Sequence, residues 1–206
     1  MQSVEMNKAC RSVVEAWHSC RRRGRGCKIS ARPVTLAAVV RTYCQDFQCG
    51  ANAEQDYYAN LPTLSEAVER AARAERPDGK RHDHQTRLSK NSLETARRQL
   101  TGAPILSCTT FAELHSLIER AILPVPGIGE LMVYDTALRI GARMGLEPEL
   151  VYLHRGTRAG AKAMGLDVSR GWVSLSELPD ELRKLAPREI EDCLCIYKNE
   201  LRKIYA

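Results

Sequence analysis

Apolar residues recur at the three- to four-residue spacing of amphipathic helices through most of the chain. The strict alternation typical of a strand is found only at residues 172–175, and only briefly. The pattern therefore predicts an all-α fold, a compact multi-helix domain. Helices are expected over residues 4–20, after Pro33, after Thr63, over residues 89–100, after Thr110, from residue 130, over residues 148–154 and after Pro179 and Pro187.

Polar and turn-forming segments separate these helices. Residues 76–83 are expected to form a loop, and the polar residues 46–60 and the Gly-, Ala- and Arg-rich residues 155–170 are interpreted as connections. The segment 21–28, RRRGRGCK, is either a solvated linker or a phosphate-contacting arm. We expect two regions that pack as one globular unit: residues 1–80, helical with the basic loop, and residues 81–206, which contain a helical hairpin.

The most informative segment is residues 123–145, where the turn Pro-Gly-Ile-Gly joins two apolar helical patterns. Two glycines on either side of one aliphatic residue favour a tight hairpin with exposed backbone N–H groups at the start of the second helix. Such amides attract an anion, for example a DNA phosphate. We therefore expect Gly127, Ile128 and Gly129 to bind DNA. The alternative is an ordinary tight turn between two helices.

The helix after this turn carries a second pattern. Residues 133–146 read VYDTALRIGARMGL and resemble the Val-Asp-Thr-His-x-x-Arg-Val-x-x-Arg-x-Gly-Leu pattern of the helix-hairpin-helix DNA glycosylase superfamily. The resemblance implies that Asp135 is catalytic: its carboxylate stabilises the positive charge on the sugar as the base leaves, or helps to activate the nucleophile. We also assign Arg139 to DNA binding. The matching positions are Asp135, Thr136, Arg139, Ile140, Arg143, Gly145 and Leu146.

Two features depart from the family pattern. In the family a whole helix and a loop separate the hairpin from the aspartate, whereas here Asp135 lies six residues after Gly129. The residue after Gly129 is Glu130, not the lysine with which bifunctional glycosylases form a Schiff base, so a monofunctional enzyme is expected. The alternative for Asp135 is a carboxylate on the helix surface that pairs with Arg139, four residues further on.

A second concentration of polar side chains lies in residues 151–165, VYLHRGTRAGAKAMG. Its two glycines would let the backbone approach a phosphodiester while cationic side chains supply the counter-charge. We expect His154, placed near Asp135, to act as a general acid or to contact the base. The alternative is a solvated basic turn that packs small residues. The expected DNA-binding residues are Arg155, Thr157, Arg158 and Lys162, and the expected pocket residues are Tyr134, Tyr152 and His154.

Composition and charge suit an anionic partner. The net charge is +6 and the pI is about 8.9, which serves either an anionic partner or solubility alone. Aromatic residues make up only 5%, so stacking platforms for single strands are scarce. The sequence has neither an apolar run approaching the roughly 18 residues of a membrane span nor a signal-peptide pattern. We expect a cytoplasmic monomer, nucleoid-associated when bound to double-stranded DNA, with no membrane partner.

The histidines and cysteines give little reason to expect a bound metal. His82 and His84 are two residues apart in a polar loop, and Cys193 and Cys195 are too close for a usual chelating pair. The eight cysteines are expected to be mostly reduced and buried. We expect no metal and no cofactor. A set built from Cys10, His18, Cys20 and Cys27 is the weaker alternative.

These observations lead to one main expectation and two alternatives. The main one is a DNA glycosylase-type enzyme that cleaves the N-glycosidic bond of a damaged or modified base flipped from duplex DNA. The first alternative is a non-catalytic helix-hairpin-helix DNA-binding module of a repair, replication or defence assembly. The second is an all-α protein-interaction domain with no role in nucleic-acid binding.

Overall fold

The computed structural model describes residues 33–206, which form two compact units. The first unit is Gly50–Glu147, and the second combines residues 33–49 with Pro148–Ala206. Both consist mainly of helices, so the all-α expectation is confirmed. The boundary expected between regions 1–80 and 81–206 lies inside the first unit. The predicted helix 4–20 and the basic segment 21–28 lie outside the described residues.

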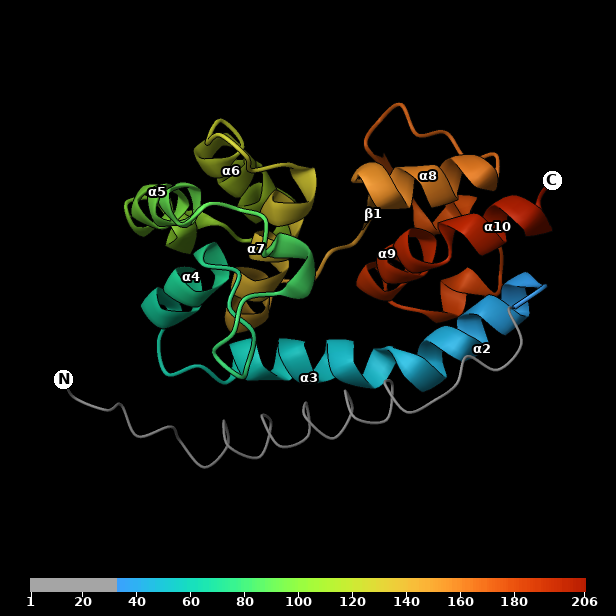
Figure 1. Cartoon of the computed structure of the whole chain (residues 1–206), viewed down its shortest axis with the longest axis horizontal. Helices are drawn as coiled ribbons and strands as arrows, with labels where there is room; N and C mark the ends of the chain where they lie inside the picture. Colours follow the sequence, from blue (N-terminus) through green and yellow to red (C-terminus); the bar gives the residue numbers. More distant parts are fainter. Residues whose placement is uncertain (1–32) are drawn as a thin grey trace. The chain divides into compact units, whose positions relative to one another are not determined.

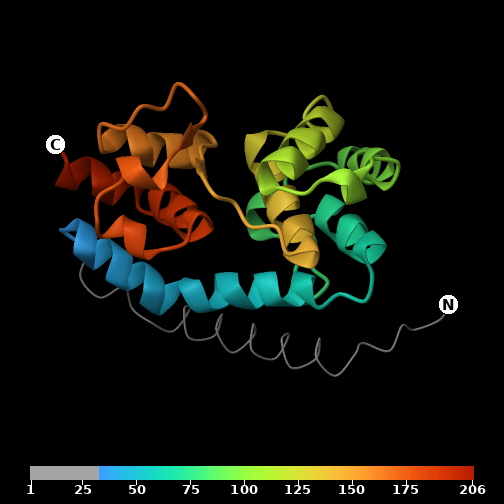
Figure 2. The same ribbon diagram turned by 180° about the vertical axis from the view of Figure 1, so that it is seen from behind.

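Helix α7 is the centre of the first unit. It packs against both α4 and α6, and α5 packs against the same two helices (Figures 1 and 2). The elements of this unit are α3 (Gln48–Ala59), whose first two residues belong to the second unit, α4 (Leu64–Ala72), the 3₁₀ turn Asp83–Gln85, α5 (Lys90–Thr101), the 3₁₀ turn Ile105–Ser107, α6 (Phe111–Ile122) and α7 (Glu130–Met144).

Several of these helices begin where the sequence predicts, because a hydroxyl side chain caps the first turn. The Thr63 hydroxyl accepts from the backbone N–H of Glu66 at 3.1 Å. At the start of α6, Thr110 accepts from the N–H of Glu113, and the Glu113 carboxylate accepts from the N–H of Thr110. This reciprocal pair is a capping box.

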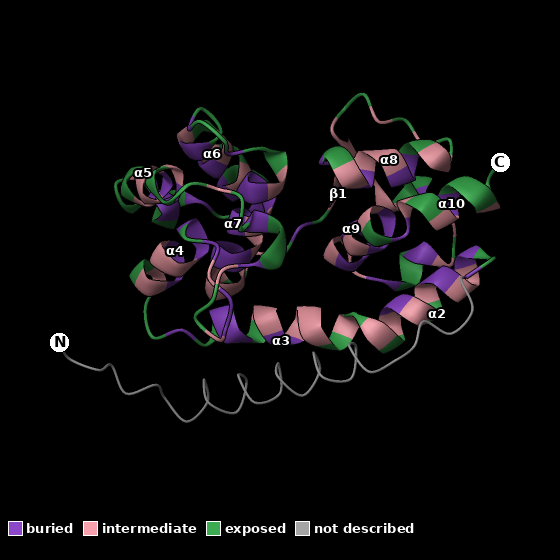
Figure 3. Cartoon of the chain, viewed as in Figure 1, coloured by how far each residue is buried: buried purple, intermediate pink, exposed green. Residues whose placement is uncertain are grey.

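The second unit is a helical layer with one short hairpin of strands. Helix α8 packs against α9 and α10, and Val151 of β1 lies opposite Val173 of β2 in an antiparallel pair. Much of α7 in the first unit and of α9 in the second is buried (Figure 3). The elements are α2 (Leu36–Asp46), β1 (Val151–Tyr152), α8 (Arg155–Ala163), β2 (Trp172–Val173), the 3₁₀ turns Leu175–Glu177 and Leu182–Lys184, α9 (Pro187–Ile196) and α10 (Lys198–Ile204).

Three local predictions are wrong. The helix expected over residues 148–154 is instead β1, because Val151 and Leu153 are both buried in the core of this unit. The connection expected over residues 155–170 contains α8, a helix stabilised by tertiary packing despite its glycines. The polar residues 46–60 contain α3, whose few large apolar side chains, Tyr57 and Tyr58, are buried.

No helix within residues 33–206 has the length and apolar character needed to cross a lipid bilayer. Of the cysteines in this part of the chain, Cys44, Cys108, Cys193 and Cys195 are free thiols. Cys49 is disulfide-bonded, an exception to the expected reduced state.

Candidate functional site

The hairpin between α6 and α7 is present where the sequence predicts it. Helix α6 ends at Ile122 and α7 begins after Gly129. Gly127 has a φ of +86°, the left-handed conformation that favours glycine. Ile128 is buried and anchors the turn, whereas Gly127 and Gly129 are exposed. The two glycines are therefore accessible from solvent, and the isoleucine holds them in place.

The N-terminus of α7 has no capping side chain. Helices α2, α4, α5, α6 and α8 each begin with a side chain that accepts from a first-turn N–H, but α7 begins with Gly129, which has none. The amides of a first helical turn have no acceptor within the helix. Together with the helix dipole, these groups favour a negatively charged ligand.

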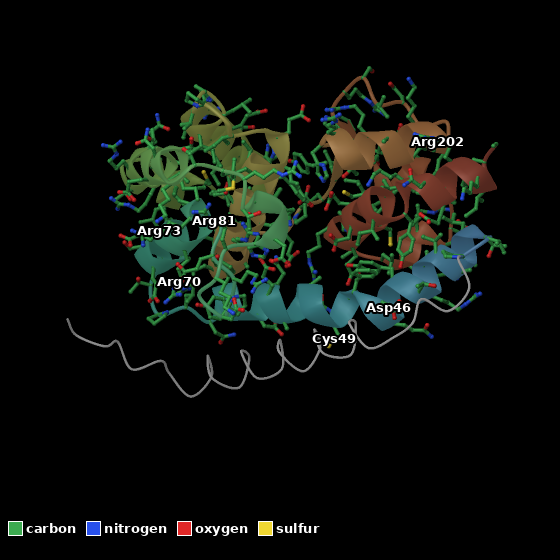
Figure 4. All side chains as sticks on the ribbon, viewed as in Figure 1. Asp46, Cys49, Arg70, Arg73, Arg81 and Arg202 are labelled. Atoms are coloured by element: carbon green, nitrogen blue, oxygen red, sulfur yellow. The ribbon has the colours of Figure 1, made fainter. Side chains whose placement is uncertain are left out.

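A basic segment, residues 84–90, lies beside this hairpin. The Ser92 hydroxyl at the start of α5 donates to the carbonyl oxygen of Pro126 at 2.7 Å and ties the segment to the turn. Arg81, labelled in Figure 4, donates from Nη1 to the carbonyl oxygen of Leu88 at 2.8 Å. Arg87 and Lys90 are exposed and form no ion pair with any described residue.

Asp135 lies one turn further along α7 in a polar network. Its Oδ2 accepts from Gln85 Nε2 at 2.6 Å and from His84 Nε2 at 2.9 Å. Arg139 Nη2 is 3.8 Å away, and the Asp135 side chain is 15% exposed. Asp135 is therefore a largely buried carboxylate, and its closest partners are His84 and Gln85.

Electrostatics keep this carboxylate ionised at neutral pH. Burial by itself raises the pKa of Asp135, but the hydrogen bond from His84 and the charge of Arg139 lower it below its ordinary value. The same hydrogen bond raises the pKa of His84 above that of a free histidine. His84 is half exposed, so a carboxylate–imidazole pair reaches the surface at this point.

Arg139 occupies the buried side of the network. Its Nε donates to Glu54 Oε1 at 2.9 Å, and its side chain is only 4% exposed. His82 Nε2 is 3.0 Å from the same Glu54 oxygen. The assignment of Arg139 to DNA binding is therefore corrected: a guanidinium that is buried on Glu54 is not presented to a phosphate. We call Glu54, His82, His84, Gln85, Asp135 and Arg139 the Asp135 network.

The residues predicted for a substrate pocket are divided between the two units. Tyr134 is buried in the first unit, where its ring packs edge-on against Phe111 with centroids 6.2 Å apart. Tyr152 and His154 belong to the second unit. Within its own unit His154 is hydrogen-bonded with Glu191 and Thr157.

The predicted DNA-binding residues of α8 divide into two groups. Thr157 is fully buried and donates to Glu191 Oε1 at 2.6 Å, and Arg158 donates to the carbonyl oxygen of Leu153 at 2.7 Å. Arg155 and Lys162 are exposed. The assignment of Thr157 to DNA binding is corrected, because its hydroxyl is used inside the unit.

The chemistry of the first unit is thus concentrated on one helix, with the hairpin at its N-terminus and Asp135 one turn later. An apolar cavity of about 270 Å³ in this unit is lined by α4, the end of α5 and the following turn, and Asp135 is not among its lining residues.

No protein-family model, curated protein or solved structure matches this chain.

Proposed function

We propose that the first unit binds the phosphate backbone of double-stranded DNA through the α6–α7 hairpin. The observation that carries the proposal is the uncapped N-terminus of α7 at the exposed glycines Gly127 and Gly129. The exposed cations Arg87 and Lys90, which form no ion pair within residues 33–206, lie on the segment that Ser92 ties to this turn. Amides and cations then contact adjacent phosphates without reading the base sequence.

Duplex DNA is favoured over a single strand because the chain has few aromatic side chains for base stacking. Glu130 opposes the proposed contact, since it is the acidic residue in the first turn of α7. Its carboxylate repels a phosphate at the same helix end. Removing the Glu130 charge should therefore strengthen DNA binding. Removing a carboxylate far from this helix end should have a smaller effect.

The test is duplex affinity measured by fluorescence anisotropy over a range of salt concentrations. Arg87→Gln/Lys90→Gln is expected to weaken binding and to lower the slope of log affinity against log salt by about 2, because two phosphate contacts are lost. Arg202→Gln/Lys203→Gln is the matched control: it removes the same two charges from an exposed part of α10. Equal losses in both double variants, or an affinity independent of salt, would contradict the proposal.

Two substitutions at residue 130 distinguish the effect of the carboxylate charge on DNA binding from that of the backbone N–H. Glu130→Gln removes the carboxylate and is expected to tighten binding. Glu130→Pro removes the carboxylate and also the N–H at the first position of α7, where proline is tolerated. Weaker binding by Glu130→Pro than by Glu130→Gln, with unchanged helix content by circular dichroism, is the expected signature of an amide–phosphate contact. Equal affinities would exclude that amide.

Base excision through Asp135 is a second candidate function, favoured by the ionised, largely buried carboxylate next to the half-exposed His84. In this proposal water adds to C1′ of the sugar, the N-glycosidic bond breaks, and the base leaves with a proton. Asp135 offsets the positive charge that develops on the sugar. Glu130 stands where a Schiff-base lysine would be needed, so the reaction stops at an abasic site.

Incubation with duplexes that carry a panel of damaged or modified bases, followed by alkali, tests this candidate. Wild-type protein is expected to yield strand breaks on one substrate. Asp135→Asn should lower the rate by about 100-fold or more while leaving DNA affinity unchanged. Asp56→Asn, which changes an exposed carboxylate on α3, is the matched control. Binding without abasic sites on any substrate would leave the hairpin as a binding module alone.

A further inference from the structure

A cluster of three metal-ligating side chains lies in the second unit, apart from the proposed DNA-binding residues of the first. His154 is the N-cap residue of α8, and Glu191 and Cys195 lie one turn apart on α9. One nitrogen, one carboxylate oxygen and one sulfur from these residues all lie within 4.8 Å of one another. We propose that His154, Glu191 and Cys195 bind one divalent transition-metal ion, and that Zn²⁺ is the ion that fits.

The close approach of α8 and α9 brings these ligands together. A Cβ atom at Gly156 would lie 2.6 Å from Cys195 Sγ, and one at Gly160 would lie 2.1 Å from the carbonyl oxygen of Leu194. Glycines at these two positions therefore let the N-terminal turn of α8 sit directly on the face of α9 that carries Glu191 and Cys195. The glycines that we interpreted as a route to a phosphodiester thus serve helix packing.

The donor set and its spacing suit zinc. Imidazole nitrogen, thiolate sulfur and carboxylate oxygen bind Zn²⁺ at about 2.0–2.3 Å, which places ligand atoms of a tetrahedral site about 3.4 Å apart. The three atoms here need only small side-chain adjustments to reach that spacing. Ligands four residues apart lie on one face of a helix, as Glu191 and Cys195 do. Three protein ligands leave a fourth position for water or an external ligand.

Two of the three proposed ligands are almost fully buried. His154 and Glu191 are each 5% exposed, and without a metal the buried carboxylate is compensated by its hydrogen-bonded partner His154. A metal ion bound here would take the place of the proton between His154 Nε2 and Glu191 Oε1. Thr157, fully buried, donates to Glu191 Oε1 at 2.6 Å and so orients that carboxylate. Outer hydrogen bonds of this kind are typical of metal sites and raise their affinity. Binding displaces the thiol proton of Cys195 and the proton between His154 Nε2 and Glu191, and the freed sulfur and nitrogen lone pairs then form bonds to the metal.

The test uses the full chain, stripped with a chelator under reducing conditions. Titration with Zn²⁺ against a chromophoric competitor should give one ion per chain, and Co²⁺ should give a sulfur-to-cobalt charge-transfer band with the strong visible absorption of a tetrahedral site. Cys195→Ser should remove the charge-transfer band and weaken Zn²⁺ binding by at least about 100-fold. Thr157→Val, which removes the outer hydrogen bonds to Glu191 and His154 but no ligand atom, should weaken it by about 10- to 100-fold.

The control thiol is Cys44, which lies on α2 of the same unit. Cys44→Ser should retain the band and the affinity. Circular dichroism of the metal-free variants separates lost ligation from lost folding, and Cys195→Ser is the most conservative of the ligand changes. Absence of a stoichiometric ion, or an unchanged charge-transfer band in Cys195→Ser, would overturn the proposal; the second result would place the metal on other residues of the chain.

Discussion

Replacing Arg139 with methionine is expected to lower the free energy of unfolding of the first unit by about 3–5 kcal/mol, the usual effect of removing one partner of a buried ion pair. Methionine retains much of the side-chain volume but leaves Glu54 buried without its guanidinium. The Nε of Arg139 is 2.9 Å from Glu54 Oε1. Hydrogen exchange of the α7 amides in increasing urea measures the loss in this unit alone.

A second substitution identifies the cause. Glu54→Gln removes the charge that Arg139 compensates, so Arg139→Met/Glu54→Gln should be less destabilised than the sum of the two single variants. The positive coupling is the signature of a direct pair. Arg143→Met, one turn further along α7 and only partly buried, should change stability by less than about 1 kcal/mol. Additive effects of Arg139 and Glu54 would show that packing, not charge, explains the loss.

The same pair makes stability depend on pH. Burial raises the pKa of Glu54, but Arg139 and the neighbouring His82 lower it to about 2. Because this pKa is below that of the unfolded chain, its stabilising contribution is complete at neutral pH and is lost as pH falls from about 4.5 towards 2. Without Arg139 the pKa of Glu54 rises, so Arg139→Met should lose less stability on acidification than wild type. Parallel curves for the two proteins would contradict this account.

The features that the sequence predicts correctly are those encoded by neighbouring residues. The caps at Thr63 and Thr110 depend on residues within one helical turn. The turn at Gly127 depends on the need for a left-handed backbone. Hydrophobic spacing likewise gives α6 and α7, because each buries one apolar face.

The features that the sequence misses depend on distant partners. Arg139 is read as a surface cation because its partner Glu54 lies 85 residues away, on a helix whose polar sequence looks like a connection. Thr157 is read as a phosphate ligand because Glu191 is 34 residues away. In both cases a polar side chain is buried on a partner that no local spacing reveals.

The cluster of His154, Glu191 and Cys195 on α8 and α9 is only partly predictable from the sequence. Glu191 and Cys195 are four residues apart, a spacing that is visible in the sequence and places both on one helix face. The third ligand, His154, is 37 residues before Glu191 and joins them only because α8 packs on α9. A search for ligand pairs at helical spacing would have found two of the three ligands, but not the histidine.

Replacing Gly160 with alanine is expected to destabilise the second unit by about 3 kcal/mol, at the upper end of the usual range for overpacking. The added Cβ would lie 2.1 Å from the carbonyl oxygen and 2.8 Å from the carbonyl carbon of Leu194, and backbone atoms cannot turn aside as a side chain can. Helix propensity acts in the opposite direction, because alanine in a helix is better than glycine by about 1 kcal/mol. A net loss of stability in Gly160→Ala therefore reports the close contact between α8 and α9.

Urea unfolding followed by the fluorescence of Trp172, in a Trp17→Phe background, reports this unit, since the chain has two tryptophans. Gly50→Ala, which lies in the first unit and is followed by hydrogen exchange of that unit's amides, is the control for the effect of alanine on helix propensity. It changes a glycine of α3 with no atom within 4 Å of the added Cβ, and should be neutral or stabilising by up to about 1 kcal/mol. A Gly160→Ala variant as stable as wild type would mean that α8 and α9 do not pack this closely.

Gly156→Ala is expected to behave differently, because its new Cβ meets the Cys195 sulfur at 2.6 Å and its next two neighbours are also side-chain atoms. A side chain can rotate away, so this variant should lose less stability than Gly160→Ala. The rotation moves the sulfur away from its present position beside His154, and Zn²⁺ affinity should therefore fall in Gly156→Ala even where folding is retained. Opposite rankings of the two variants in stability and in metal affinity would separate the packing role of α8 from its role in presenting ligands.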